Sequence, residues 1–293
     1  MYGEEWVGVT GGVVVGDVEG LSEVELRDLL SLKKIISELS GKESKKTRLT
    51  QRDYDILEFI QDQKFSTLEA LYFRFFDVRK NASEELPKQF FTTRQRLLVL
   101  RQVGLLNSKH SMYSPHQVYV LTPKGYQVLN QERPSRAFQG VAYDLDSIHF
   151  RHDEKVTLCR VAIEKTGKAI RWLSEQRLRS VGFEVESFEK KMPMNSIPDG
   201  IFIAPKGKRV AFEIECSPRK KERFKAKARF YQGLMQDSQP LIEHVIWVAV
   251  DKRIYADLQE SIPAGSKDFS VEPFSYFLGK LSTSAIKAGV NNG

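Results

Sequence analysis

Two short apolar runs joined by a lysine- and glycine-containing turn constrain the fold of this chain more than any other feature. The first run follows the tetrapeptide Ile-Pro-Asp-Gly at 197–200, and the second run covers residues 210–216. The turn between them lies at 206–208. Apolar runs of this length, bounded by turn residues, predict two neighbouring strands.

Three acidic side chains lie on these two strands. Asp199 begins the first strand, and Glu213 and Glu215 belong to the second. Because residues two apart in a strand point to the same face, Glu213 and Glu215 project together, and a hairpin partner can place Asp199 beside them. Three converging carboxylates repel one another unless a divalent cation lies among them, and such ligands suit Mg²⁺ or Mn²⁺. We therefore predict Asp199 and Glu213 as metal ligands.

Each acid also has a simpler interpretation. An Asp before a Gly is usually a turn residue, and a Glu in a strand usually lies on a solvated face. Phe212, Ile214 and Cys216 already supply the apolar side of the second strand, so both glutamates share the other side. A lysine-rich helical segment follows at once, and this combination favours a functional site.

The spacing of Pro198-Asp199 and Glu213-x-Glu215 resembles the PD-(D/E)xK nuclease superfamily, whose core is a metal-dependent phosphodiesterase site. More closely, the segments IPDGIFI and VAFEIECSPRKKERFKAKARFY are similar to the replication-relaxation, or mobilisation-protein C, family. The upstream segments HFRHDEKVTLCRVAIEKTG and RWLSEQRLRS resemble that family's entry helix and the Trp-x-x-Glu that follows it. The resemblance extends from about residue 50 to about residue 250.

The resemblance implies an architecture and a set of site residues. The fold class would be α+β with α/β, an N-terminal winged helix-turn-helix followed by a PD-(D/E)xK restriction-endonuclease-like domain. The family's motif residues have counterparts in Pro198, Asp199, Gly200, Glu213, Glu215, Lys227 and Tyr231. Glu175, which ends the Trp-x-x-Glu, is an outer catalytic candidate.

The chain departs from the superfamily at Glu215, where a lysine usually stands. That lysine would orient water and stabilise the charge that develops on the phosphate. The helix after Glu215 offers Lys227 and Lys225 as replacements, with Lys221 less favoured. Lys227 shares a helix face with residues four positions away on either side, whereas Lys225 lies about 200° around the helix. We therefore expect Lys227 to be the catalytic cation.

Residues 49–133 show the pattern of a DNA-binding domain. Three helical segments, capped by Thr50, capped by Ser66 and starting near Thr92, precede two strands and a last helix that opens at Thr122. This is the order of a winged helix-turn-helix, whose third helix enters the major groove with its N-terminal residues facing the bases. The expected DNA-binding residues are Thr92, Thr93, Arg94, Gln95 and Arg96.

Charge and side-chain chemistry agree with a nucleic-acid partner. Arg and Gln can form paired hydrogen bonds with the edges of guanine and adenine. Residues 42–136 contain 17 Lys and Arg against 10 Asp and Glu, and this difference of +7 equals the formal net charge of the whole 293-residue chain. A basic excess favours a polyanionic partner. Because winged domains also mediate protein contacts, that alternative stays open.

The pattern divides the chain into four parts. These are an N-terminal arm, helix and basic linker at 1–48, the DNA-binding domain at 49–133, the nuclease-like domain at 145–262 and a C-terminal tail at 263–293. The helix of the first part is expected at 21–39. Within the third part, the order of helix, three strands, helix and strand is that of the nuclease core, and 245–250 indicates a strand buried on both faces.

Several other classes of protein lack support in the sequence. Cys159 and Cys216 show no metal-ligand spacing and fit small buried residues of a reducing compartment. No apolar run approaches membrane-spanning length, and the N-terminus lacks the pattern of a signal peptide. His149 and His152 are expected to cap or pack. We therefore expect a cytoplasmic protein with no membrane partner.

Together these features predict a DNA-binding protein of plasmid or mobile-element processing. The winged helix would locate double-stranded DNA, and the second domain would nick it as a metal-dependent, relaxase-like endodeoxyribonuclease with Mg²⁺ or Mn²⁺ as cofactor. Glu215 would complete the metal shell or polarise water. The alternative is a non-enzymatic transcription or replication regulator with an inactive nuclease-like domain. The family resemblance also implies other mobilisation proteins as partners.

Overall fold

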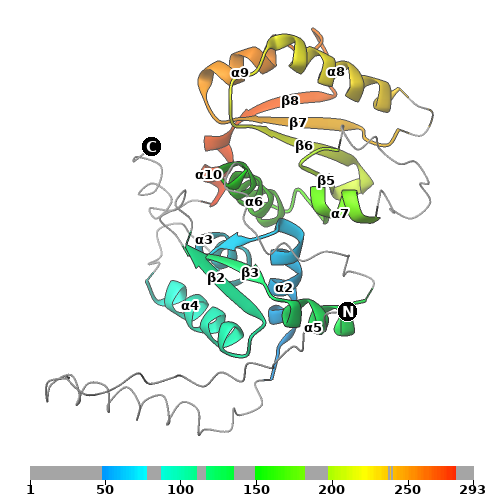
Figure 1. Cartoon of the computed structure of the whole chain (residues 1–293). Helices are drawn as coiled ribbons and strands as arrows, with labels where there is room; N and C mark the ends of the chain where they lie inside the picture. The colour runs from blue at the N-terminus through cyan, green and yellow to red at the C-terminus, as the bar shows by residue number, and fades with distance from the viewer. Residues whose placement is uncertain are drawn as a thin grey trace, which may run out of the picture. The chain divides into compact units, whose positions relative to one another are not determined.

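The computed structural model describes residues 48–77, 87–110, 117–134, 149–181, 197–236, 238 and 240–281. All of these residues except Arg48 belong to one compact unit, Leu49–Gly293. The arm expected at 1–20, the helix expected at 21–39, most of the basic linker and the end of the expected tail lie outside the described residues. The described chain is a mixed α+β protein (Figure 1).

The first part of the described chain combines helices with a small antiparallel sheet. The sheet has the order β1-β3-β2, and both of its pairings are antiparallel. Its strands are β1 (Ser66–Thr67), β2 (Leu106–His110) and β3 (Gln117–Leu121). The helices are α2 (Gln51–Gln63), α3 (Leu68–Leu71), the π-helical turn η1 (Tyr72–Phe76), α4 (Pro87–Gln102) and α5 (Pro123–Glu132).

The starts of the helices test the sequence predictions directly. Thr50 begins α2 as expected, and its backbone N–H donates to the Asp53 carboxylate at 2.6 Å. The second helix is capped by Thr67, whose Oγ1 accepts from the N–H of Ala70 at 3.3 Å, so the prediction of Ser66 was wrong by one residue. Ser66 lies instead in β1, where it pairs with β3.

The third helix is longer than the sequence indicated. It begins at Pro87, five residues before the expected start at Thr92. Proline is favoured at the first position of a helix, where its missing N–H costs nothing. Thr92 therefore lies in the second turn of α4 and not at its N-terminus. Thr122 begins α5 as expected, with its Oγ1 accepting from the N–H of Gly125 at 2.9 Å.

The second part is built around a five-stranded sheet with the order β4-β5-β6-β7-β8. The pairings from β4 to β6 are antiparallel, and those from β6 to β8 are parallel. The strands are β4 (Arg171–Ser174), β5 (Gly200–Ile203), β6 (Arg209–Glu215), β7 (His244–Ala249) and β8 (Phe269–Pro273). The helices are α6 (Phe150–Lys165), α7 (Glu175–Val181), α8 (Lys221–Met235), α9 (Lys252–Gln259) and α10 (Phe274–Leu281).

Helices cover both faces of this sheet. Figure 1 shows α8 and α9 on one face and α6 and α10 on the other. Alternation along β6 divides its side chains accordingly, since Phe212 and Ile214 pack in one hydrophobic cluster and Ala211 packs in the other. The expected burial of β7 on both faces is confirmed, because Trp247 and Val248 are fully buried in different clusters.

The segment that the sequence assigned to a tail from 263 onward carries two further elements. Strand β8 pairs in parallel with β7, and α10 follows it directly. Phe277 on α10 packs edge-on against Phe212, with ring centroids 6.2 Å apart. Pro273 ends β8, and α10 buries its apolar residues Phe277 and Leu281.

The two parts share a buried interface. Arg160 on α6 is buried and donates to the Asp62 carboxylate of α2 at 3.3 Å and to Glu164 at 3.1 Å. Its guanidinium also lies over the ring of Phe59, 4.7 Å from the centroid. One hydrophobic cluster continues from α2 through α6 to β6. The end of α2 is therefore fixed against the second part.

Candidate functional site

A buried glutamate on β6 lies at the centre of the site. Glu213 is 2% exposed, and its Oε2 lies 2.7 Å from Nζ of Lys227 on α8. The hydroxyl of Tyr231, one turn further along α8, donates a hydrogen bond to Oε1 of the same carboxylate. Because Lys227 and Tyr231 are four residues apart, one face of α8 presents both to β6. The exposed Lys225 lies elsewhere on the helix.

Burial changes the ionisation of this cluster. Desolvation raises the pKa of Glu213 to about 7, with Asp199 reinforcing the rise and Lys227 opposing it. Burial alone would lower the pKa of Lys227, but the Glu213 and Asp199 carboxylates outweigh it and raise that pKa. Burial also raises the pKa of the Tyr231 hydroxyl, which therefore keeps its proton and donates it.

Asp199 lies immediately before β5, next to the acid-bearing end of β6. Gly200 pairs with Phe212 in the sheet, so continuing the register brings Asp199 opposite Glu213. Its Oδ2 accepts a hydrogen bond from the backbone N–H of Ile214 at 2.8 Å. The same oxygen lies 3.2 Å from Nε2 of His152 on α6. A backbone donor and a ring nitrogen thus hold this carboxylate in place.

The glycine after Asp199 is required by packing. A Cβ atom on Gly200 would lie 2.4 Å from Cζ2 of Trp172, the buried tryptophan of β4. The indole stacks on Phe202, with ring centroids 5.9 Å apart, and cannot move aside. The Pro-Asp-Gly sequence therefore reflects the close approach of the Trp172 ring to β5 as well as the chemistry of the acid.

Glu215 ends β6 and is half-buried. Burial raises the pKa of its carboxyl, Lys227 opposes the rise and Asp199 adds to it. The guanidinium groups of Arg219 and Arg223 also act on this carboxylate. Cations from the following segment therefore lower the cost of ionising this acid.

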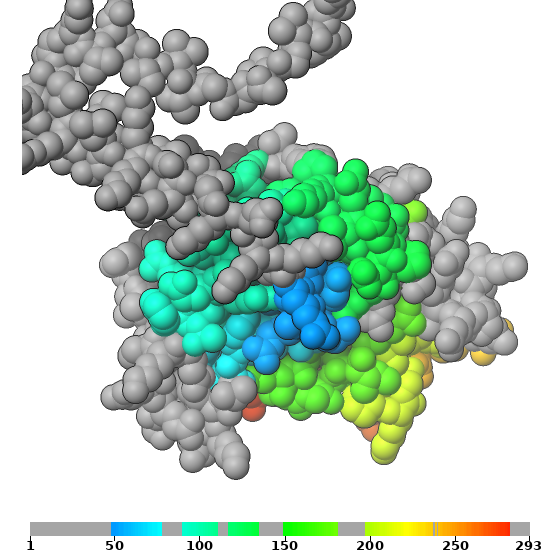
Figure 2. Space-filling model, turned by 90° about the horizontal axis from the view of Figure 1, so that it is seen from below, coloured from blue at the N-terminus to red at the C-terminus, as the bar shows by residue number. Residues whose placement is uncertain are grey.

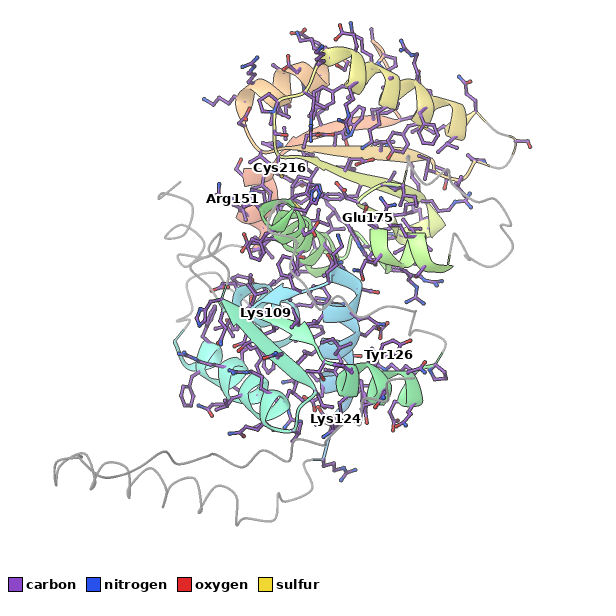
Figure 3. The ribbon with its side chains drawn as sticks, viewed as in Figure 1. Lys109, Lys124, Tyr126, Arg151, Glu175 and Cys216 are labelled. Atoms are coloured by element: carbon purple, nitrogen blue, oxygen red, sulfur yellow. The ribbon has the colours of Figure 1, made fainter. Side chains whose placement is uncertain are left out.

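The remaining catalytic candidate, Glu175, lies across a small cavity from Asp199. It begins α7 (labelled in Figure 3), and its Oε2 lies 3.5 Å from Nζ of Lys64. Lys64 also contacts Asp153 Oδ2 at 3.0 Å, and Asp153 Oδ1 in turn lies 3.1 Å from Nδ1 of His152. The cavity between these groups has a volume of only about 20 Å³.

The charges around this cavity stabilise one another. Burial alone would lower the pKa of His152, but Asp199 and Asp153 raise it to about 11, so the imidazole is protonated at neutral pH. Burial alone would raise the pKa of Asp153, but His152 and Lys64 hold it below its usual value. A protonated ring donates from both nitrogens, to Asp153 and to Asp199.

Carboxylate oxygens are suitable ligands for a divalent cation, but these carboxylates are not positioned to coordinate one together. Asp199 raises the pKa of both Glu213 and Glu215, so the three carboxylates lie within electrostatic range of one another. Among the described residues, no group of three His, Cys, Asp or Glu side chains is placed to hold a metal ion. Glu213 contacts Lys227 and Tyr231 instead.

Only some of the expected DNA-binding residues of α4 reach the surface. Thr92, Arg94 and Gln95 are exposed, whereas Thr93 is buried and faces the core. Thr93, which was expected to contact DNA, instead lies on the core-facing side of α4 and is fully buried. Figure 2 shows part of α4, in cyan, at the surface beside the start of α2, in blue.

Arg96 has a structural partner instead of a free guanidinium. Its Nε donates to Oδ1 of Asp53 at 2.6 Å, and a second contact joins the same two groups. Asp53 is fully buried, and Arg96 holds its pKa below the usual value against the effect of burial. Arg96 therefore fixes α4 to the start of α2.

Sequence reasoning did not identify three residues as members of the site. They are Lys64, His152 and Asp153. His152 had been noted with His149 at a spacing of three, so it carried a signal. Lys64 and Asp153 carried none, because their contacts join residues 89 positions apart.

No protein-family model matches the chain, and no curated protein matches its sequence. None of the helices in the described ranges is both long enough and apolar enough to cross a membrane.

Proposed function

We propose that this chain binds double-stranded DNA and nicks it in a reaction that depends on Mg²⁺ or Mn²⁺, as part of plasmid or mobile-element processing. The single observation that carries the proposal is the contact of Lys227 with Glu213 at 2.7 Å beside Asp199. The helix that follows the acid-bearing strand would thus supply the cation that a lysine at position 215 would otherwise provide. The fold we propose is a winged helix-turn-helix followed by a PD-(D/E)xK-like core.

Each site residue has a role in this proposal. Asp199 and Glu213 would hold the ion, and Glu215 would complete its shell or orient water. When bound, the ion would supply the nucleophilic water and neutralise the leaving oxygen. Lys227 would steady the phosphate of the cleaved strand. Glu175 would act from the far side of the cavity.

Ion binding requires these residues to exchange partners. Glu213 must be ionised and must give up part of its contact with Lys227, which frees the ammonium for a phosphate oxygen. Asp199 must share Oδ2 between the ion and its present donors, Ile214 and His152. Because the pKa of Glu213 is about 7, we expect ion affinity to fall as the pH decreases below 7.

The exposed face of α4 supports DNA as the partner. Arg94 and Gln95 are exposed there and can form paired hydrogen bonds with base edges. The excess of 17 basic over 10 acidic residues in 42–136 would attract the phosphate backbone. We also propose other mobilisation proteins as partners and a cytoplasmic location, the latter because both cysteines are free thiols.

A second candidate function is a non-enzymatic DNA-binding regulator of transcription or replication. The observation that favours it is that protein cations already neutralise the acids. Lys227 pairs with Glu213, and His152 pairs with Asp199. A core of this kind would keep the nuclease-like fold as a rigid support for DNA binding.

Nicking of supercoiled plasmid separates the two functions. Wild-type protein is incubated with Mg²⁺, with Mn²⁺ and with a chelator at saturating protein, so that binding does not limit the result. Nicking should require the ion and should disappear in Lys227→Ala, whereas the exposed matched control Lys225→Ala should retain most of it. If wild-type protein shows no metal-dependent nicking on any plasmid, including one from its native element, the regulator is the better assignment.

A further inference from the structure

Charged side chains form an alternating chain that ends at Asp199. The order is Glu175, Lys64, Asp153, His152 and Asp199, with successive contacts of 3.5, 3.0, 3.1 and 3.2 Å. Acids and bases alternate at every step, so each group is held by one or two neighbours of opposite charge. The four elements that contribute are α7, the end of α2, α6 and the residue before β5.

Lys64 is the member of this chain that comes from the first part of the protein. It ends α2 and is half-buried, and Asp153 and Glu175 raise its pKa in spite of burial, so it carries a full charge. Asp62, two residues earlier, has a buried Oδ1 that no described residue hydrogen-bonds, yet Nζ of Lys64 is directed to Asp153 and Glu175. The ammonium is thus oriented towards the carboxylate site.

The backbone of Lys64 also points to a use for its side chain. Its φ is 68°, a conformation that glycine adopts readily and that costs other residues free energy. Glycine is the common residue at such a helix end. Lysine at this position gives up backbone stability and gains an ammonium in the cavity, and strain of this kind is frequent at functional sites.

We propose that Lys64 is a positioning residue of the carboxylate site. By holding Oδ2 of Asp153, it leaves Oδ1 for His152 and so directs Nε2 of His152 at Asp199. Lys64 thereby connects the end of α2, in the proposed DNA-binding part, to the acid that the proposed nuclease uses. The consequence for cleavage rests on the proposed function, but the orientation of Asp199 does not.

The backbone N–H of Ile214 reports on Asp199 directly, because it donates to Oδ2 at 2.8 Å. The test compares Lys64→Gly, Lys64→Met and Lys64→Arg with Lys168→Met. This control removes one positive charge at an exposed position, where Lys168 contacts the hydroxyl and the ring of Tyr276. The Ile214 amide is followed by nuclear magnetic resonance. In Lys64→Gly and Lys64→Met its signal should shift and its hydrogen exchange should become about tenfold faster. Lys64→Arg and Lys168→Met should match wild type.

Nicking adds a second readout that a purely structural role would not reproduce. Lys64→Gly should lower kcat about tenfold while the Kd for duplex DNA stays within about twofold, and Lys64→Arg should restore kcat. Lys64→Gly relieves the positive φ, so it keeps the test valid if Lys64→Met fails to fold.

The two proposals fail in different ways. An unchanged Ile214 amide in folded Lys64→Gly overturns the positioning role, whatever the nicking result. An altered amide with unaltered kcat in an active protein also overturns the connection to cleavage. If wild-type protein does not nick DNA at all, the proposed function fails, and the amide measurement alone decides whether Lys64 positions Asp199.

Discussion

Replacing Lys227 with methionine should destabilise the protein in a pH-dependent manner. The substitution keeps the aliphatic stem but removes the ammonium that lies 2.7 Å from the buried Glu213 carboxylate. An unpaired buried charge costs about 3–5 kcal/mol when one partner of a pair is removed. Glu213 can avoid part of that cost by taking up a proton, so the loss depends on the pH.

The pKa of Glu213 sets the size of the effect. Its pKa rises from 4.5 in the unfolded chain to about 7 in the folded protein, so the folded state binds a proton that the unfolded chain loses in this range. The ionised form therefore costs stability as the pH rises through this window. Below about pH 6, Lys227→Met should cost about 1 kcal/mol, the value of one hydrogen bond. At about pH 8.5 Glu213 is ionised in the wild type, whereas in the variant it keeps its proton. This pH is about 1.5 units above the wild-type pKa of about 7, and at about 1.36 kcal/mol per unit the difference adds about 2 kcal/mol to the loss.

Urea unfolding at about pH 5.5 and about pH 8.5 measures this difference. Lys225→Met is the matched control, because Lys225 is exposed on the same helix and should change stability by less than about 0.5 kcal/mol at either pH. Equal losses for Lys227→Met at the two pH values would refute the assignment of a titrating, buried Glu213–Lys227 pair.

Three further predictions concern DNA binding, thermal stability and metal binding. Arg94→Ala should weaken duplex binding by about 1–3 kcal/mol in a gel-shift titration at fixed salt with unchanged circular dichroism, and unaltered affinity would favour a protein partner for α4. Arg96→Ala should instead lower the melting temperature, because it leaves Asp53 buried without its cation. Asp199→Asn and Glu213→Gln should each abolish the heat of Mg²⁺ or Mn²⁺ binding in calorimetry, and identical isotherms for wild type and both variants would rule out a carboxylate metal site.

The parts of the site that the sequence predicted follow from the spacing of residues within single strands and helices. Alternation along β6 identified Glu213 and Glu215 as neighbours on one face, and the four-residue spacing from Lys227 to Tyr231 identified the face of α8 that meets them. Both patterns depend only on strand and helix geometry, which short segments determine. The position of Asp199 followed from the hairpin for the same reason.

Contacts between distant segments could not be predicted in this way. Arg96 has a side chain that can read bases, but its guanidinium hydrogen-bonds to Asp53, 43 positions earlier in the chain. Lys64 and Asp153 meet only because α2 packs on α6, and nothing within either helix marks that contact. Helix α10 was missed because its apolar residues are buried by contacts with distant segments, such as Phe277 with Phe212, which the local sequence does not show.

The buried contact between Arg160 and Asp62 has a consequence for how the molecule can be divided. Separating the two parts at the segment between α5 and α6 would break the ion pair of Arg160 with Asp62 and would expose both halves of a common hydrophobic cluster. The parts on either side of that segment are therefore not interchangeable modules. Grafting either part onto another protein would require the surface of α2 to be transferred together with α6.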